Sequence, residues 1–203
     1  MFDVEVFILV GGASSRMGED KSRLVLGNET TVERLGRELS SVAGRISLVG
    51  SQRPEPELGW KNIPDLRPRW GALGGICTAL GACQAEWAAV VACDLPFVTR
   101  ELFLRLLQLA ETNQDPPLDA VVPIQADLRP QPLCALYRRE SCLKEAEKLI
   151  VGGEHKPRAL LAAIRTGWVE FGELTDLPGA EYFFFNVNTP AEYEQAKQIL
   201  TLL

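Results

Sequence analysis

The chain has 203 residues, of which 46% are hydrophobic and 24% are charged, as is typical of a soluble globular protein. The net charge of −6 argues against a nucleic-acid partner, because binding to phosphate backbones depends on an excess of basic residues. A small anionic ligand is compatible with this charge, since a few local cations suffice. The apolar run at 4–10 is too short to cross a bilayer, and no signal-peptide pattern is present. We therefore expect a cytoplasmic protein with no membrane segment, in which residues 1–203 form one domain.

Five cysteines are present, an odd number, and no two of them have the C-x-x-C spacing of a metal or redox motif. Most of them stand among apolar residues, where a reduced cysteine packs as a small hydrophobic side chain. Neither a disulfide framework nor a zinc site is indicated. We expect buried, reduced thiols at Cys77, Cys83, Cys93, Cys134 and Cys142.

Strands and helices are expected to alternate along most of the chain. Apolar runs predict strands at 4–10, 45–50, 87–93, 119–124, 132–137 and 168–172. Apolar residues at helical spacing predict helices at 30–43, 73–83, 101–111, 139–150, 157–164 and 190–203, and a polar, proline-rich loop is expected at 51–70. This order predicts an α/β fold in three layers, α/β/α, with a mostly parallel, Rossmann-like sheet. In such sheets ligands bind beyond the carboxyl ends of the strands, so the residues that follow each strand are the candidates for function.

The stretch LVGGASSRMGEDKSRL (9–24) comes at the end of the first strand and is rich in glycine and serine. Backbone N–H groups of such a loop can approach an anion closely, and Arg16 and Lys21 could neutralise phosphate charge. The loop is not a Walker A motif, since two acidic residues separate Gly18 from Lys21, and it is not a G-x-G-x-x-G motif. Composition alone leaves a solvated strand-to-helix turn and a phosphate-binding loop equally open.

Asp94 directly follows the buried strand at 87–93. A carboxylate there is costly unless it meets a cation or hydrogen-bond donors, and Mg²⁺ commonly binds one or two carboxylates together with substrate phosphates. The alternative role is the N-cap of the following helix, for which Asp is well suited. Thr99 stands nearer to the helix at 101–111 and is expected to be its cap, which favours the metal role for Asp94.

Asn186 and Asn188 stand in FFFNVNTPAEY, two positions apart on a segment that is expected to be extended. Their side chains are therefore expected on one face, where two amides can contact polar ligand edges or the waters of a metal ion. The alternative is a capping role at the start of the last helix, before Pro190. Thr189 alone can provide that cap, which leaves Asn186 unassigned.

A weaker candidate is Asp65, in PDLRPRWGALGGICTAL, where Gly71, Gly74 and Gly75 would let a flat ring approach the backbone. A loop that leads into a glycine-tolerant helix explains the same residues equally well. His155 belongs to no recognisable Ser, His and Asp arrangement, so we expect it at the surface. The four tryptophans are scattered and are expected to be packing groups.

Read together, these places resemble the molybdenum cofactor guanylyltransferases, which are nucleotidyltransferases of the nucleotide-diphospho-sugar transferase type. The family's opening loop, L-x-G-G-x-S-x-R-M-G-x-D-K, is matched by LVGGASSRMGEDK, with Val10 at a position that usually holds Ala. Later blocks follow in the family's order: P-D with G-A-L-G-G-I, A-C-D-L-P, Q-P-L-C-A-L-Y and N-V-N-T-P-A-E-Y. The resemblance covers residues from about 6 to 195 and is carried chiefly by the opening loop.

The resemblance implies a single nucleotidyltransferase domain that joins GMP from GTP to molybdenum-molybdopterin and releases pyrophosphate, with Mg²⁺ as the cofactor. The implied GTP contacts are Leu9, Val10, Gly11, Gly12, Lys21, Asp65 and Asp94. Among these, Lys21 would hold the phosphates, Asp65 would lie on the nucleoside side and Asp94 would bind the metal. Arg16, Asn186 and Asn188 would lie towards the metal or the pterin phosphate. Lys21, Asp94 and Arg16 are thus the expected catalytic residues.

Two other functions stay open at this point. A CTP-dependent sister enzyme would make the cytosine dinucleotide or another cytidylyl product, and such relatives tend to carry L-A-A-G in the opening loop. The pair Gly11 and Gly12 favours guanine instead. A non-enzymatic adaptor could deliver the pterin cofactor, but loss of Lys21 or Asp94 would be expected in it, and both are present. Molybdopterin-synthesis enzymes and acceptor apoenzymes are the candidate protein partners.

Overall fold

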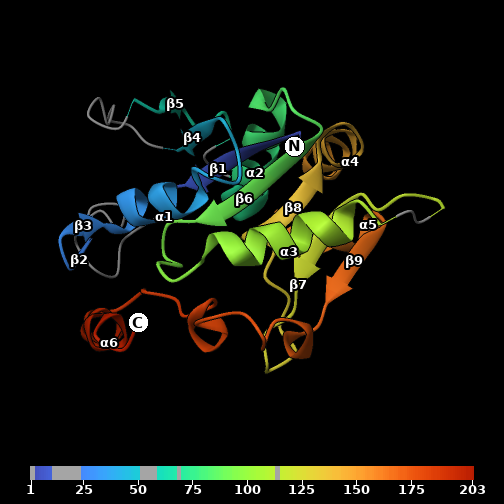
Figure 1. Ribbon diagram of the computed structural model, residues 1–203. Coiled ribbons are helices and arrows are strands. Elements are labelled where there is room, and N and C mark those ends of the chain that lie inside the picture. The colour runs from blue at the N-terminus through green and yellow to red at the C-terminus, as the bar shows by residue number, and fades with distance from the viewer. Residues whose placement is uncertain (1–2, 11–23, 51–58, 68–69, 113–114) are drawn as a thin grey trace.

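The computed structural model describes residues 3–10, 24–50, 59–67, 70–112 and 115–203, and a seven-stranded sheet lies at its centre (Figure 1). The strands are β1 (Val4–Leu9), β4 (Ile46–Val49), β5 (Lys61–Ile63), β6 (Trp87–Ala92), β7 (Ala120–Pro123), β8 (Cys134–Arg138) and β9 (Thr166–Val169). Their order is β5-β4-β1-β6-β8-β7-β9. Only β8 within this sheet is antiparallel to its neighbours, so the predicted mostly parallel sheet is confirmed.

Helices cover both faces of the sheet, which confirms the predicted three layers (Figure 1). On one face lie α1 (Thr31–Leu39) and α3 (Arg100–Ala110), and on the other lie α2 (Gly71–Ala82), α4 (Arg139–Val151) and α5 (Pro157–Ala163). Strand β1 is buried along its whole length because its side chains alternate between these two cores. Among the helices in the described part of the chain, none has the length and hydropathy needed to cross a bilayer.

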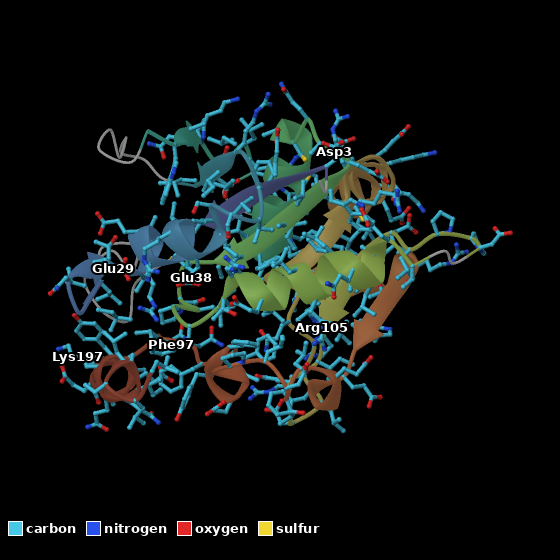
Figure 2. The ribbon with its side chains drawn as sticks, in the orientation of Figure 1. Asp3, Glu29, Glu38, Phe97, Arg105 and Lys197 are labelled. Atoms are coloured by element: carbon cyan, nitrogen blue, oxygen red, sulfur yellow. The ribbon has the colours of Figure 1, made fainter. Side chains whose placement is uncertain are left out.

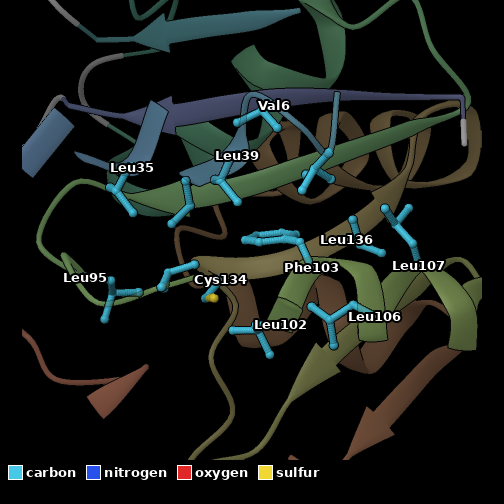
Figure 3. Packing of buried hydrophobic residues seen from close by; sticks show 14 of the residues in the cluster. Val6, Leu35, Leu39, Leu95, Leu102, Phe103, Leu106, Leu107, Cys134 and Leu136 are labelled. Atoms are coloured by element: carbon cyan, nitrogen blue, oxygen red, sulfur yellow. The ribbon is translucent and has the colours of Figure 1, made fainter. Parts of the chain in front are cut away.

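The core that α1 and α3 form on the sheet is built from the stripes of apolar residues that the sequence predicted (Figure 3). Leu35 and Leu39 point inward from α1, and Leu102 and Leu106 do so from α3; all four are fully buried. They pack around Phe103 against the sheet. Burying one such side chain contributes roughly 1.5–3 kcal/mol, so these two stripes hold both helices on the sheet.

A third apolar cluster lies beside the sheet and joins three parts of the chain that are far apart in sequence. It contains residues of the hairpin of β2 (Val25–Leu26) and β3 (Glu29–Thr30), of the turn after β6 and of α6 (Pro190–Leu200). Figure 1 shows α6 beside this hairpin. We call it the C-terminal cluster; its buried members are Leu24, Leu26, Phe97, Val187, Ala196 and Ile199.

Two short elements were not predicted. Strand β5 lies inside the stretch that we expected to be a loop, because three residues with one buried side chain give no apolar run. The β2–β3 hairpin was also missed, although its Gly-Asn turn is a recognised hairpin signal and Gly27 has the φ of +69° that favours glycine. Both elements are stabilised by pairing with a neighbouring strand rather than by their own sequence pattern.

Three predicted details were wrong. Strand β9 begins two residues before the predicted strand at 168–172 and ends at Val169. It ends there because Phe171–Glu173 form a 3-10 helix, closed by hydrogen bonds between Glu170 and Glu173. Helix α6 ends at Leu200 rather than Leu203. Helix α3 does begin after Thr99, as predicted, but the Thr99 hydroxyl makes no capping hydrogen bond.

Two helical glycines allow a matched test of the packing. A Cβ atom at Gly36 of α1 would lie 1.7 Å from the Trp60 ring, whereas a Cβ at Gly81 of α2 would meet nothing within 4 Å. We expect Gly36→Ala to lower the free energy of unfolding by about 1–3 kcal/mol, because the ring must move. Gly81→Ala should raise it by up to about 1 kcal/mol through helix propensity. Denaturant unfolding measures both, and shifts of the same sign would contradict the packing at Gly36.

Candidate functional site

The parallel strands end side by side at one edge of the sheet. Leu9, the last residue of β1, pairs with Val49 of β4 and with Ala92 of β6, and Val49 pairs in turn with Ile63 of β5. The register therefore places the residues after these four strands along a common edge. Each predicted site residue that the structure describes in the first half of the chain ends or follows one of these strands.

Leu9 and Val10 continue the strand pairing at this edge. The N–H of Val10 donates to the carbonyl of Val49 over 2.9 Å, and the N–H of Cys93 donates to the carbonyl of Leu9 over 3.0 Å. Leu9 is buried and Val10 is half-buried. A Cβ atom at Gly75 would lie 3.3 Å from Leu9 Cδ1, so this glycine lets α2 approach the end of β1 closely.

Asp65 is held in a fixed orientation in the segment between β5 and α2. Its Oδ1 atom accepts hydrogen bonds from the N–H of Arg67 over 2.8 Å and from the Thr78 hydroxyl over 3.3 Å. A Cβ atom at Gly74 would lie 2.7 Å from the Arg67 carbonyl, so packing within the protein explains this glycine. Hydrogen bonds within the protein thus hold the half-buried Asp65 beside the ends of β4 and β5.

The structure brings Asp94 together with the two asparagines, which come 92 or more residues later in the chain. The N–H of Val187 donates to the Asp94 carbonyl over 2.9 Å. Val187 is fully buried in the C-terminal cluster, whereas Asn186 and Asn188 on either side of it are half-buried. This alternation fits the prediction that both amides lie on one face of an extended segment.

The observed helix starts show which of the predicted residues act as N-caps. No helix begins directly after Asp94, since α3 starts at Arg100. At the start of α6 the Thr189 hydroxyl accepts from the N–H of Glu192 over 3.2 Å, so the predicted Thr189 cap is confirmed. The Asn188 side chain does not serve as that cap; its backbone N–H donates to Glu192 Oε2 over 2.7 Å.

The remaining predicted residues, Gly11, Gly12, Arg16 and Lys21, lie outside the described residues, so their roles stay predictions. The described residues on either side of that segment contact the chain just after β6, where Asp94 lies. Leu9 is joined to Cys93 by a backbone hydrogen bond, and Leu24 packs in the same apolar cluster as Phe97 and Val187.

The donors around Asp94 suit a hard cation. Asp94 and the asparagine amides supply oxygen ligands, which Mg²⁺ prefers, and substrate phosphates commonly complete such a site. Within the described ranges no group of three or more His, Cys, Asp or Glu residues could hold a metal. Asp94 is the carboxylate that we expect at this metal site, and the phosphates of a bound nucleotide would supply further oxygen ligands.

All five cysteines are described, are buried and form no disulfide, as predicted. Burial raises the pKa of Cys77, Cys83, Cys134 and Cys142, to about 11 for Cys83. Such thiols are protonated at neutral pH and are poor nucleophiles. The exposed His155 stacks on Trp70, with ring centroids 4.3 Å apart, which agrees with the expected surface position.

Comparison with known proteins gives a consistent result. The family model described as the MobA-like NTP transferase domain matches residues 6–167. A protein of Pelotomaculum thermopropionicum named "Probable molybdenum cofactor guanylyltransferase" is 32% identical over 94% of this chain and 90% of its own. A protein with the same name from Carboxydothermus hydrogenoformans is 33% identical over 100% of this chain and 99% of its own.

Solved structures with the same fold are also known. Molybdopterin-guanine dinucleotide biosynthesis protein A from Archaeoglobus fulgidus is 27% identical and superposes with a TM-score of 0.80, covering 98% of this chain and 100% of that one. The 2-C-methyl-D-erythritol 4-phosphate cytidylyltransferase of Thermus thermophilus, 18% identical, superposes with a TM-score of 0.71 over 98% of this chain and 100% of its own. At that identity the second likeness shows the fold alone.

The raised thiol pKa values give a pH-dependence that can be measured. Because folding raises the pKa of Cys83 from about 9 to about 11, ionisation of this thiol favours the unfolded chain. Its contribution to stability is full below about pH 9 and is lost as the pH rises towards about 11. Denaturant unfolding should show this fall, and Cys83→Ala should show a smaller one. Equal falls in both proteins would contradict the assignment.

Proposed function

This chain belongs to the MobA-like NTP transferase family, and on that premise we propose that it transfers GMP from GTP to molybdenum-molybdopterin, releasing pyrophosphate. Membership of the family confirms the resemblance that the sequence motifs indicated and makes the protein a nucleotidyltransferase. The guanine nucleotide and the pterin acceptor are supported by relatives that carry the name guanylyltransferase over nearly their full length. The observation that carries the site is the hydrogen bond between Val187 and Asp94, which joins two separate polar blocks at the end of β6.

The proposed reaction is a displacement at phosphorus. A terminal phosphate oxygen of molybdopterin forms a bond to the α-phosphorus of GTP, and the bond from that phosphorus to the oxygen bridging to the β-phosphate breaks. Pyrophosphate leaves with the electron pair, and the product is molybdopterin guanine dinucleotide. The nucleophile is already an anion, so no general base is needed, which agrees with the absence of a histidine from the site among the residues described. Catalysis then rests on positioning and on neutralising charge.

Each predicted residue has a role in this proposal. Leu9 and Val10, with Gly11 and Gly12, would form the floor under the guanine nucleotide at the end of β1. Asp65 would accept a hydrogen bond from the ribose or the base. Lys21 and Arg16 would neutralise the phosphates. Asp94, Asn186 and Asn188 would complete the site on the side of the metal.

Mg²⁺ fits the donors at the carboxyl end of β6. Asp94 would hold it directly, and the amides of Asn186 and Asn188 would support it or its waters. When bound, the ion would offset negative charge that develops on the phosphate oxygens. The protein's own part is to keep the Asp94 carboxylate and the two amides at one place, which the buried Val187 between them supports.

The competing functions differ in the nucleotide and in catalysis. A CTP-dependent sister enzyme would share the fold, and a delivery adaptor would bind the pterin without turnover. We expect pyrophosphate release with GTP in the presence of molybdenum-molybdopterin and Mg²⁺, and not with ATP, CTP or UTP. A coupled pyrophosphate assay with each nucleotide, with and without the acceptor, measures this. Release with CTP alone would establish the sister enzyme, and no release with any nucleotide would favour the adaptor.

Asp94→Asn tests the metal role. The change removes one charge and keeps the side-chain shape and the backbone contact to Val187, so the fold should survive. We expect pyrophosphate release to fall by roughly 100-fold or more, with little change in Tm. The matched control is Asp176→Asn, which loses only an exposed pair with Arg105 and should keep wild-type turnover. Wild-type turnover in Asp94→Asn would remove this residue from the metal site.

A further inference from the structure

We propose that Arg34 is a positioning residue that fixes residues 94–97, the turn carrying the metal-binding carboxylate; this inference rests on the proposed function. Arg34 lies on α1, far from Asp94 in sequence, and belongs to none of the family blocks found in the sequence. Its side chain is only 15% exposed. Its Nε atom donates to the carbonyl of Pro96 over 2.9 Å, which is a direct contact with the turn.

The same guanidinium also lies over an aromatic ring of the turn. Its central carbon is 5.7 Å from the ring centroid of Phe97, within the range of a cation–π contact. Phe97 is 2% exposed and packs against two other rings. Its ring centroid lies 6.2 Å from that of Tyr182 and 6.1 Å from that of Phe185. In Figure 2 Phe97 lies in the region between α1 and α6.

The turn is therefore fastened at two carbonyls. Val187 donates to the carbonyl of Asp94, and Arg34 donates to that of Pro96. Phe97 and Val187 belong to the C-terminal cluster, so the two anchors share a packed apolar base. Between them they hold the backbone of residues 94–97, from which the Asp94 side chain extends.

Glu29 holds Arg34 in this position. Arg34 Nη1 lies 3.4 Å from Glu29 Oε1, and Arg37 Nη2 lies 2.9 Å from the same oxygen. The hydrogen bond from Arg37 is the main cause that lowers the pKa of Glu29, so the carboxylate is charged at neutral pH. Glu29 belongs to the hairpin that follows the segment containing Lys21, so the contacts of Arg34 with Glu29 and Pro96 join that hairpin to the metal-bearing turn.

Three simultaneous contacts explain why an arginine is needed. The Nε atom donates to a carbonyl, an Nη atom donates to a carboxylate, and the guanidinium carbon lies over an aromatic ring. A lysine carries one ammonium group on a flexible stem and cannot make all three contacts. Arg34→Lys therefore keeps the charge and loosens the turn.

Arg37 offers a matched control on the same helix. It also pairs with Glu29, but its side chain is 56% exposed. Its hydrogen bonds in the described part of the chain go to Glu29 and Glu38, not to the turn. A loss common to Arg34→Lys and Arg37→Lys would reflect the Glu29 network, whereas a loss confined to Arg34→Lys would reflect the turn.

The experiment compares wild type, Arg34→Lys, Arg37→Lys and Phe97→Leu, each checked for folding by circular dichroism and assayed well below its Tm. For Arg34→Lys we expect kcat to fall roughly 10-fold and the half-saturating Mg²⁺ concentration to rise several-fold, because small displacements of catalytic groups are costly. The KM for GTP should change little. Phe97→Leu should also lower kcat and raise the half-saturating Mg²⁺ concentration. This variant tests the proposal if Arg34→Lys does not fold.

A second readout does not need turnover. Mn²⁺ binding in the presence of GTP and without the acceptor, followed by electron paramagnetic resonance, should weaken several-fold in Arg34→Lys and stay within about twofold of wild type in Arg37→Lys. A lowered Tm with unchanged kcat, Mg²⁺ requirement and Mn²⁺ affinity would overturn the proposal, as would a wild-type protein that binds no Mn²⁺. If wild type releases no pyrophosphate, the proposed function fails, and the Mn²⁺ comparison still decides the role of Arg34.

Discussion

The register of β1 with its two neighbours is the constraint on which the candidate site depends. Because Leu9 is paired with both Val49 and Ala92, the chain leaves β1, β4 and β6 at the same height. A one-residue slip in a strand would turn its buried side chains to the opposite face of the sheet, and both faces here are covered by helices. Packing of the two cores therefore fixes the edge where Asp65 and Asp94 stand.

Strand register alone does not complete this edge. The asparagines reach it because the C-terminal segment returns across the end of β6 and buries Val187 in the cluster with Phe97 and Leu24. The apolar residues of that cluster come from three distant parts of the chain, so their burial brings the polar groups beside them to the same edge of the sheet. Arg34 adds the polar contact that fixes the turn within this apolar frame.

The sequence predicted the fold well where the pattern was local and long. The strand at 87–93 is a continuous apolar run and the helix at 101–111 has a strong helical periodicity, and the structure places both within a residue or two. Asp94 and Asn186 were recognised because each follows or interrupts an apolar run. The two-residue strands β2 and β3 and the three-residue β5 were not recognisable by periodicity, because pairing partners define them. Arg34 was missed for a related reason: its importance lies in contacts with residue 96 and beyond, which no spacing in α1 reveals.

The cationic groups near the proposed site have two different roles: some would neutralise phosphate charge, and Arg34 contacts groups of the protein itself. The protein is acidic overall, and both proposed substrates are anions, so positive charge must be concentrated where the phosphates lie. Arg34 is already engaged by protein groups, because its guanidinium pairs with Glu29, donates to the Pro96 carbonyl and lies over the Phe97 ring. Its effect on the reaction would be geometric. Under the proposed function, neutralising the transferred phosphate would fall to Lys21, Arg16 and the metal proposed at Asp94, and both cations belong to the glycine-rich stretch that follows β1 in the sequence.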